Sequence, residues 1–241
     1  MKTIGMVGGM SWESTAIYYR EINEGIKAKT GSLHSAKIIL NSLDFQEIER
    51  LQHSENWAET SNILKRAAKS VERAGADFLI ICTNTMHIVA PEIIEHLSIP
   101  VLHIADATGE KLAKEGIKNV GLLGTNFTME KSFYKGRLLE KYGIETVVPS
   151  LKDRALIHDI IYKELCCGVI KRSSQDCYLE VIEKLKGFGA EGIILGCTEI
   201  GMLVSAENTI SRIYDTTKIK GRIAKRAKRK DIEVRNISVI F

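Results

Sequence analysis

The sequence predicts an α/β fold built from two similar lobes, each with a parallel sheet flanked by helices. Short runs rich in Ile, Leu and Val alternate with longer segments whose apolar residues recur at the helical period. Most of the short runs are continuously apolar, which is typical of strands buried on both faces of a parallel sheet. Two pairs of motifs also recur at nearly the same offset, which indicates an internal repeat.

The strands and helices follow one another along almost the whole chain. The predicted strands are Thr3–Val7, Ala36–Leu43, Phe78–Cys82, Pro100–Ile104, Asn119–Leu123, Ile144–Val148, Gly192–Leu195 and Ile210–Tyr214. The predicted helices are Trp12–Lys29, Trp57–Ala74, Met86–Leu97, Ala105–Glu115, Met129–Tyr142, Arg154–Leu165 and Ser174–Phe188. This alternation predicts parallel strands joined by right-handed crossovers.

The internal repeat divides the chain into two lobes. Met1–Gly8 resembles Ile117–Gly124 at an offset of 116 positions. Ala74–Thr83 resembles Phe188–Thr198, and the cysteines of this second pair are 115 positions apart. We therefore expect lobes related by a pseudo-twofold axis, with the functional site between them. Residues 1–98 and 210–241 are assigned to the first lobe, and residues 99–209 to the second.

Composition excludes several classes of protein. With 241 residues, 44% of them hydrophobic and 27% charged, the chain is close to the globular average and unlike collagen, coiled coils or disordered proteins. No apolar run approaches the roughly 20 residues that a membrane-spanning helix needs. The N-terminus lacks a secretory pattern. We therefore expect a cytoplasmic protein with reduced cysteines and no membrane partner.

The basic charge is confined to one segment. The net charge is +4, but Lys218–Lys230 contains eight Lys or Arg and no acid, so the remaining chain is at −4. A solvated charged face or a frayed terminus is favoured over nucleic-acid binding for this run.

Two Cys-Thr motifs carry the strongest chemical signal. Cys82 ends an apolar strand and precedes Thr83, Asn84 and Thr85, residues that often cap helices. In open α/β sheets, ligands bind at the carboxyl ends of the strands. Free N–H groups there favour an anion and lower the pKa of a thiol. For an isolated cysteine, a core residue at the end of a strand is the alternative interpretation.

Cys197 repeats this arrangement in the second lobe, where Thr198 and Glu199 follow it. The pseudo-twofold repeat is expected to place Cys82 and Cys197 on opposite sides of one crevice. Inverting a stereocentre by proton transfer needs a base on one face of the carbon and an acid on the other. A thiolate and a thiol can fill these roles and exchange them with the direction of reaction.

Other motifs indicate structure more than chemistry. Gly5–Ser11 contains Gly-x-x-Gly-Gly and not Gly-x-Gly-x-x-Gly, so a tight turn capped by Ser11 is favoured over a dinucleotide loop. A close backbone approach to a small carboxylate is its functional alternative. His87 either polarises the thiol or is a buried core histidine. The other cysteines, Cys166, Cys167 and Cys177, are interpreted as packing residues. The histidines and cysteines have no metal-ligand spacing, so no metal is expected.

Four motifs together resemble the cofactor-independent aspartate/glutamate racemase family, and within it the broad-specificity or L-aspartate/glutamate-specific racemases of enteric bacteria. The motifs are Gly8–Thr15, Cys82–His87, His103–Thr108 and Gly196–Ile200. The resemblance runs from Met1 to about Ile219 and implies a two-lobed, often dimeric α/β enzyme with its site between the lobes. It implies no pyridoxal phosphate, no metal and no other cofactor.

The resemblance also assigns roles to residues. It makes Cys82 and Cys197 the catalytic pair. The residues that it assigns to substrate binding are Met10, Gln52, Thr83, Asn84, Thr85, Thr198 and Glu199. On this interpretation one thiolate removes the Cα proton and the other thiol protonates the opposite face, while N–H and hydroxyl groups stabilise the charge on the α-carboxylate.

The sequence departs from this family at two places. Where archaeal-type aspartate racemases hold the side-chain carboxylate with Arg and Lys, the nearest positions here are Gln46–Ile48 and Cys166–Cys167. After Ile219 the family usually continues with a His and a closing helix rich in Ala and Glu. Here the chain turns basic and ends in Ile-Ser-Val-Ile-Phe.

The sequence therefore predicts a homodimeric racemase of aspartate, glutamate or a related small amino acid. Another isomerase with paired cysteines, a hydantoin racemase or maleate isomerase, is the alternative within this superfamily. An arylmalonate decarboxylase is less favoured because that resemblance carries only one of the two cysteines. The alternative from another class is an inactive protein that binds a small anion or nucleic acid. A thiol on both faces of one carbon favours an enzyme over a pure binder.

Overall fold

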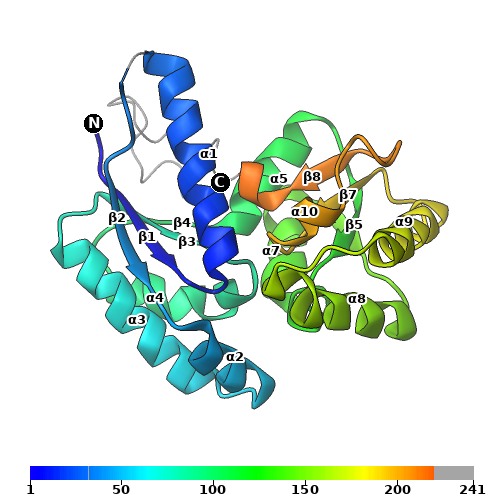
Figure 1. Cartoon of the computed structure of the whole chain (residues 1–241), viewed down its shortest axis with the longest axis horizontal. Helices are drawn as coiled ribbons and strands as arrows, with labels where there is room; N and C mark the ends of the chain where they lie inside the picture. Colours follow the sequence, from blue (N-terminus) through cyan, green and yellow to red (C-terminus); the bar gives the residue numbers. More distant parts are fainter. Residues whose placement is uncertain (32, 220–241) are drawn as a thin grey trace. The chain divides into compact units, whose positions relative to one another are not determined.

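The computed structural model of the chain describes residues 1–31 and 33–219, which form two compact units (Figure 1). Unit 1 comprises Met1–Ile104, and unit 2 comprises Ala105–Ile219. Each unit contains a four-stranded parallel sheet flanked by helices, which confirms the predicted fold class. The basic run from Lys220 onward lies outside the described residues.

The sheet of unit 1 has the strand order β2-β1-β3-β4. Its elements, in chain order, are β1 (Ile4–Gly8), α1 (Trp12–Thr30), β2 (Ile38–Ser42), α2 (Phe45–His53), α3 (Trp57–Arg73), β3 (Phe78–Ile81), the 3₁₀ helix η1 (Thr85–Val89), α4 (Ala90–His96) and β4 (Val101–Leu102). Helix α5 (Ile104–Lys114) starts at the last residue of unit 1 and continues into unit 2.

The sheet of unit 2 has the equivalent order β6-β5-β7-β8. After α5 its elements are β5 (Asn119–Leu123), α6 (Asn126–Glu130), α7 (Ser132–Tyr142), β6 (Glu145–Val147), α8 (Leu151–Lys163), the 3₁₀ helix η2 (Leu165–Cys167), α9 (Arg172–Gly187), β7 (Gly192–Leu195), α10 (Ile200–Leu203) and β8 (Ile213–Asp215). The matching strand orders confirm the two similar lobes that the repeat predicted.

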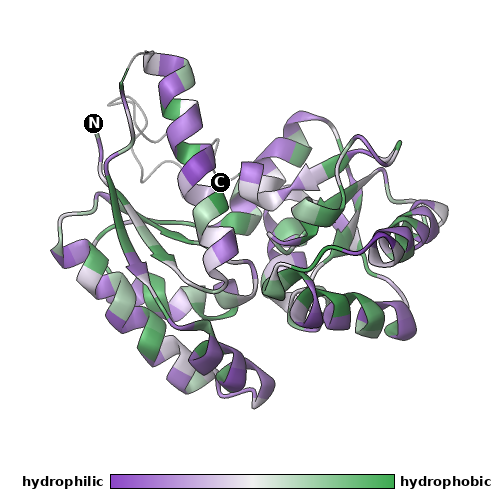
Figure 2. Cartoon of the chain, in the orientation of Figure 1, coloured by the Kyte–Doolittle hydropathy of each residue, from purple (hydrophilic) through white to green (hydrophobic). Residues whose placement is uncertain are grey.

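The two central strands of each sheet, β1 and β3 in unit 1 and β5 and β7 in unit 2, are buried on both faces, as their apolar sequences predicted. In unit 1, Val7 and Leu79 pack in one cluster with residues of α3 and α4. The alternating residues Met6 and Ile80 are also fully buried. Figure 2 shows the contrast between the mostly hydrophobic strands and helices such as α3, whose hydrophobic and hydrophilic residues alternate along the helix.

The predicted boundaries between the lobes need correction at both junctions. Starting the second lobe at residue 99 separated β4 from its sheet, yet Val101 pairs with Leu79 of β3. Starting the return to the first lobe at residue 210 did the same to β8, yet Ile213 pairs with Ile193 of β7. In each unit the fourth strand lies beside the third, so the chain leaves a unit only after that strand is placed.

Three details of the helices also differ from the sequence prediction. Helix α2 was not predicted; it begins at Phe45, and the side chain of its N-cap residue Asp44 accepts a hydrogen bond from the Gln46 N–H. The predicted helix Met129–Tyr142 is interrupted at Lys131, whose backbone is extended, so α6 and α7 are separate. The Cys-Thr motif of each unit leads into a short helix, η1 or α10.

Candidate active site

The first strand of unit 1 ends in a turn that only glycine can form. Gly9 has a φ of +87°, and a Cβ at this position would overlap the carbonyl oxygen of Leu43. The side chain of Thr15 fixes the turn, because its Oγ1 accepts a hydrogen bond from the Gly9 N–H (2.8 Å) and donates one to the Ser11 carbonyl (2.9 Å). Ser11 caps α1 as predicted. These contacts explain the glycines structurally and hold Met10 in a buried position.

Cys82 lies directly after β3, at the carboxyl end of the strand, as the sequence predicted. Its N–H donates to the Val7 carbonyl (2.9 Å), which ties the cysteine to the end of β1. Cys82 is fully buried, and the polar residues Thr83, Asn84 and Thr85 that follow it are buried as well. A fully buried run of amide and hydroxyl groups beside a thiol is unusual for a simple strand end, since such groups are costly to bury without polar partners.

Gln52 comes from α2 and lies beside the same loop. It is 2% exposed, and its Nε2 lies 3.9 Å from the Sδ of Met86, which belongs to η1 directly after the Cys82 loop. Helix α2 follows β2, so three neighbouring strands of unit 1 lead to these residues at one edge of the sheet. The structure therefore gathers Met10, Gln52 and the Cys82–Thr85 segment within unit 1.

The side chain of His87 holds the start of α5. Its Nε2 lies 3.2 Å from the Ile104 N–H, which donates to it, and its ring meets that of His103 edge to face at 4.6 Å. Nε2 is therefore an acceptor, and a neutral ring carries its proton on Nδ1. The His87 side chain is fully buried, as the interpretation of a core histidine predicted.

The second thiol lies after β7 in unit 2. The Gly196 N–H donates to the Leu123 carbonyl (2.6 Å), which ties the start of the Cys197 loop to the end of β5. The Cys197 Sγ donates to Oε2 of Glu199 at 2.9 Å, and the Thr198 hydroxyl donates to the same oxygen at 2.9 Å. Glu199 is 3% exposed. One buried carboxylate thus accepts hydrogen bonds from both residues that precede it.

The protonation of Cys197 differs from the sequence-based expectation. Burial raises the pKa of the Cys197 thiol well above its usual value, and the Glu199 carboxylate raises this pKa further. The expected lowering by a helix N-terminus is therefore wrong at this position. The reason is local: the thiol is buried and the Glu199 carboxylate is in direct contact with the sulfur, and both raise its pKa. Helix α10 has only four residues, so its dipole is too small to offset them.

The structure adds residues that sequence reasoning missed at the end of β5. The Thr125 hydroxyl accepts a hydrogen bond from the Thr128 N–H (3.3 Å), and the Asn126 N–H donates to Nδ1 of His158 (3.2 Å). Gly124 approaches the Gly196 carbonyl closely, which places this turn beside the Cys197 loop. The internal repeat could have predicted this turn, because Gly124–Asn126 aligns with Gly8–Met10 in unit 1.

The remaining cysteines have structural environments. Cys166 and Cys177 pack against the hydrophobic cluster of unit 2, which confirms their interpretation as packing residues. Cys167 is exposed, so the same interpretation was wrong for it. Within residues 1–31 and 33–219, no three His, Cys, Asp or Glu side chains gather in a cluster that could hold a metal ion. No helix in this described part of the chain is long and apolar enough to cross a membrane.

Each unit therefore presents one thiol at the carboxyl end of its third strand, followed by polar side chains that are buried. A thiol can give a proton, and its thiolate can take one, without a metal or a cofactor. Backbone N–H groups and hydroxyls next to it are suited to a small anion.

Comparisons with known proteins point in the same direction. The sequence model of the family described as Asp/Glu/Hydantoin racemase matches residues 7–221. The fold is similar to that of a candidate Asp/Glu racemase from Yersinia pestis (51% identity over 94% of this chain and 99% of that chain, TM-score 0.87). An aspartate racemase homologue from Pyrococcus horikoshii has 34% identity over the same shares and a TM-score of 0.81.

The curated relatives match over a shorter length. A glutamate racemase from Actinobacillus pleuropneumoniae is 25% identical over 142 residues, which is 58% of this chain and 52% of that protein. The chain thus spans about half the length of the glutamate racemases that it matches.

Proposed function

Because the chain belongs to the Asp/Glu/Hydantoin racemase family, we propose that it is a cofactor-independent isomerase that interconverts the L and D forms of aspartate or glutamate. The acidic amino acids named in its relatives support this substrate class. A related small amino acid is the nearest variation of the same proposal.

One observation carries the proposal. Cys82 follows β3 and Cys197 follows β7, and these strands hold the same third position in two sheets of equal order. Each thiol is followed by a threonine whose side chain is buried. A protein that only binds an anion needs hydroxyl and N–H groups at these strand ends, but it does not need a sulfur at both.

In the proposed reaction, one cysteine removes the Cα proton as a thiolate and the other delivers a proton to the opposite face as a thiol. The proton count balances, because the first cysteine ends as a thiol and the second as a thiolate. Reaction of the opposite enantiomer restores the starting protonation states. Since the two free enantiomers have equal free energies, each cysteine must be able to serve in both roles.

The polar residues near each thiol have binding roles in this proposal. In unit 1, N–H and hydroxyl groups of Thr83 to Thr85 hold the α-carboxylate, where negative charge develops as the proton leaves. Met10 and Gln52 complete the unit 1 side, at the ends of β1 and of α2. In unit 2, Thr198 orients the carboxylate of Glu199, which controls the proton of Cys197.

The test is hydrogen exchange in deuterated water. The protein is incubated with one enantiomer of aspartate or glutamate, and loss of optical rotation is followed together with incorporation of deuterium at Cα. We expect both in the wild type. Cys82→Ser and Cys197→Ser should each abolish inversion, and each should leave exchange of at most one enantiomer, because a single base remains.

Cys177→Ser is the matched control, since it removes a partly buried thiol of unit 2 that packs in the core. Full racemisation by either the Cys82 or the Cys197 variant would refute the two-thiol mechanism. A panel with a 5-substituted hydantoin and maleate separates the alternatives in the same superfamily, because turnover of these compounds without exchange of aspartate or glutamate would replace the proposed substrate class.

A further inference from the structure

We propose that His87 is a positioning residue for the reaction: it fixes the Cys82 loop to the first turn of α5, the segment through which the chain passes from unit 1 to unit 2. This inference deepens the proposed function and rests on it for the role of Cys82. His87 lies five residues after that cysteine, within η1.

The side chain of His87 supplies an acceptor that a helix start requires. The first N–H groups of an α-helix have no acceptor within the helix. Helix α5 begins at Ile104, and its N–H donates to the His87 Nε2 at 3.2 Å. Both residues are fully buried, so water does not replace this acceptor. The His103 ring also packs against the imidazole, with 4.6 Å between the two ring centroids and an angle of 69° between the ring planes.

The backbone of His87 is tied to the loop that carries the thiol. Its N–H donates to the carbonyl of Asn84 at 3.0 Å, two residues beyond Cys82. The Cys82 N–H in turn donates to Val7 at the end of β1. A single residue therefore joins the start of α5, through its ring, to the Cys82 loop, through its backbone.

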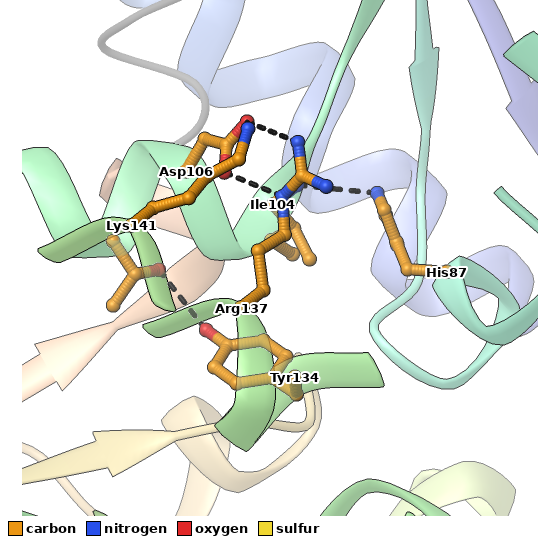
Figure 3. Close-up of polar contacts among 7 residues, drawn as sticks. His87, Ile104, Asp106, Tyr134, Arg137 and Lys141 are labelled. Carbon is orange, nitrogen blue, oxygen red and sulfur yellow. Dashed lines mark hydrogen bonds and ion pairs between the residues drawn. The ribbon is translucent and has the colours of Figure 1, made fainter. Parts of the chain in front are cut away.

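The next turn of α5 is held just as firmly within unit 2. Asp106 is buried and forms two hydrogen bonds with Arg137 of α7, at 2.5 and 2.7 Å (Figure 3). Tyr134, also on α7, donates to the Thr108 hydroxyl at 3.1 Å (Figure 3). These contacts hold α5 within unit 2 from Asp106 onward, two residues after the N–H that donates to His87.

The test begins with the kinetics of three variants. His87→Ala removes the acceptor and should lower kcat by about 10- to 100-fold with a smaller change in KM, since misplacement of a catalytic group by about 1 Å costs up to about 100-fold. His87→Gln keeps an acceptor oxygen and should recover most of the lost kcat. His96→Gln, on the exposed end of α4, should match the wild type.

The same bond can be removed from its other end. Ile104→Pro deletes the donor, and proline is well suited to the first position of a helix. If His87 acts through this bond, the kcat of the double variant with His87→Ala should be no lower than that of the worse single variant, and the two losses should not multiply. Multiplying losses, or a His87→Gln variant as slow as His87→Ala, would overturn the proposal and leave His87 a packing residue.

A second readout does not depend on activity. Alkylation of each cysteine by iodoacetamide is followed by peptide mass spectrometry without substrate. In His87→Ala the rate at Cys82 should rise about tenfold, because the loop opens locally, while the rate at Cys197 stays at its wild-type value. An unchanged rate at Cys82 contradicts the inference. If the wild type fails to racemise any substrate, the proposed function fails, and the alkylation rates still decide whether His87 holds the Cys82 loop in place.

Discussion

The contact between Cys197 and Glu199 makes a sharp prediction for the variant Glu199→Gln. The Sγ of Cys197 donates to Oε2 of Glu199 at 2.9 Å, and this carboxylate helps to raise the pKa of the thiol. Glutamine keeps an oxygen that accepts the thiol proton but removes the negative charge. We therefore expect the pKa of Cys197 to fall in the variant, while burial continues to hold it above the usual value.

The size of the effect follows from the distance. Two unit negative charges 2.9 Å apart repel by about 6 kcal/mol at an effective dielectric constant of about 20. The thiolate avoids part of this repulsion by moving away from the carboxylate, so this figure is an upper limit. The lower limit is the difference between a charged and a neutral hydrogen bond, about 1 kcal/mol. Since about 1.4 kcal/mol corresponds to a factor of ten, the lower limit predicts a thiolate population about fivefold larger in the variant at any pH below both pKa values.

The assay is the pH dependence of alkylation at Cys197, read from its peptide by mass spectrometry. The midpoint of the rate profile should lie at lower pH in Glu199→Gln than in the wild type. Exposed Cys167 is alkylated in the same samples and serves as the internal control, because its profile should not change. A midpoint at Cys197 that stays in place, or moves to higher pH, would show that the carboxylate does not govern this thiol.

Three further predictions concern stability. The folded state holds the Cys197 proton more tightly than the unfolded chain does, so the free energy of unfolding should fall as pH rises above about 8.5. Chemical denaturation between about pH 8.5 and 10 measures this fall, and it should be smaller in Cys197→Ser. Gly9→Ala should destabilise the protein by more than about 2 kcal/mol, because the new Cβ overlaps the backbone. Gly31→Ala, at a positive φ with open space around it, should cost only about 1 kcal/mol. Thermal unfolding compares the two variants, and equal losses of stability would contradict the overlap at Gly9. Among the residues that the structure describes, Arg137→Met leaves buried Asp106 with one cationic partner, Lys141, at 3.5 Å. This variant should destabilise the protein by about 2 to 3 kcal/mol, while Asp106→Asn with Arg137→Met should recover part of that loss.

The positions of the strands along the chain were predictable because each strand is a short run of apolar residues. All eight predicted strands exist, since an apolar run of four or five residues between helical segments has few other uses than a central parallel strand. The edge strands β4 and β8, one from each sheet, were found but assigned to the wrong lobes. Their partners are decided by pairing with Leu79 and Ile193, a contact across the sheet that no local pattern encodes. Helix α2 was missed for a similar reason, because its nine residues are too few for the helical period to stand out.

The location of the thiols was predictable, but their environments were not. The repeat places Cys82 and Cys197 at equivalent strand ends, and the structure confirms both positions. The sequence could not show that Glu199 turns back to accept the proton of the cysteine two residues before it, because this depends on side-chain rotamers in a short helix. Nor could it choose the role of His87, since the partner of that ring is a backbone N–H that any residue at position 104 except proline would supply.

The difference between the two Cys-Thr motifs bears directly on the proposed mechanism. Asn84 and Glu199 occupy equivalent positions two residues after the cysteines, so the repeat places a neutral amide beside one thiol and a carboxylate beside the other. The carboxylate favours the protonated form of Cys197 in the free protein. If the reaction proceeds through two thiols as proposed, it must start with one protonated and one deprotonated, and on that proposal this asymmetry assigns Cys197 as the resting proton donor. The enantiomer whose Cα proton faces Cys82 should therefore show the larger kcat at neutral pH. In Glu199→Gln the kcat values for the two enantiomers should be closer to each other than in the wild type.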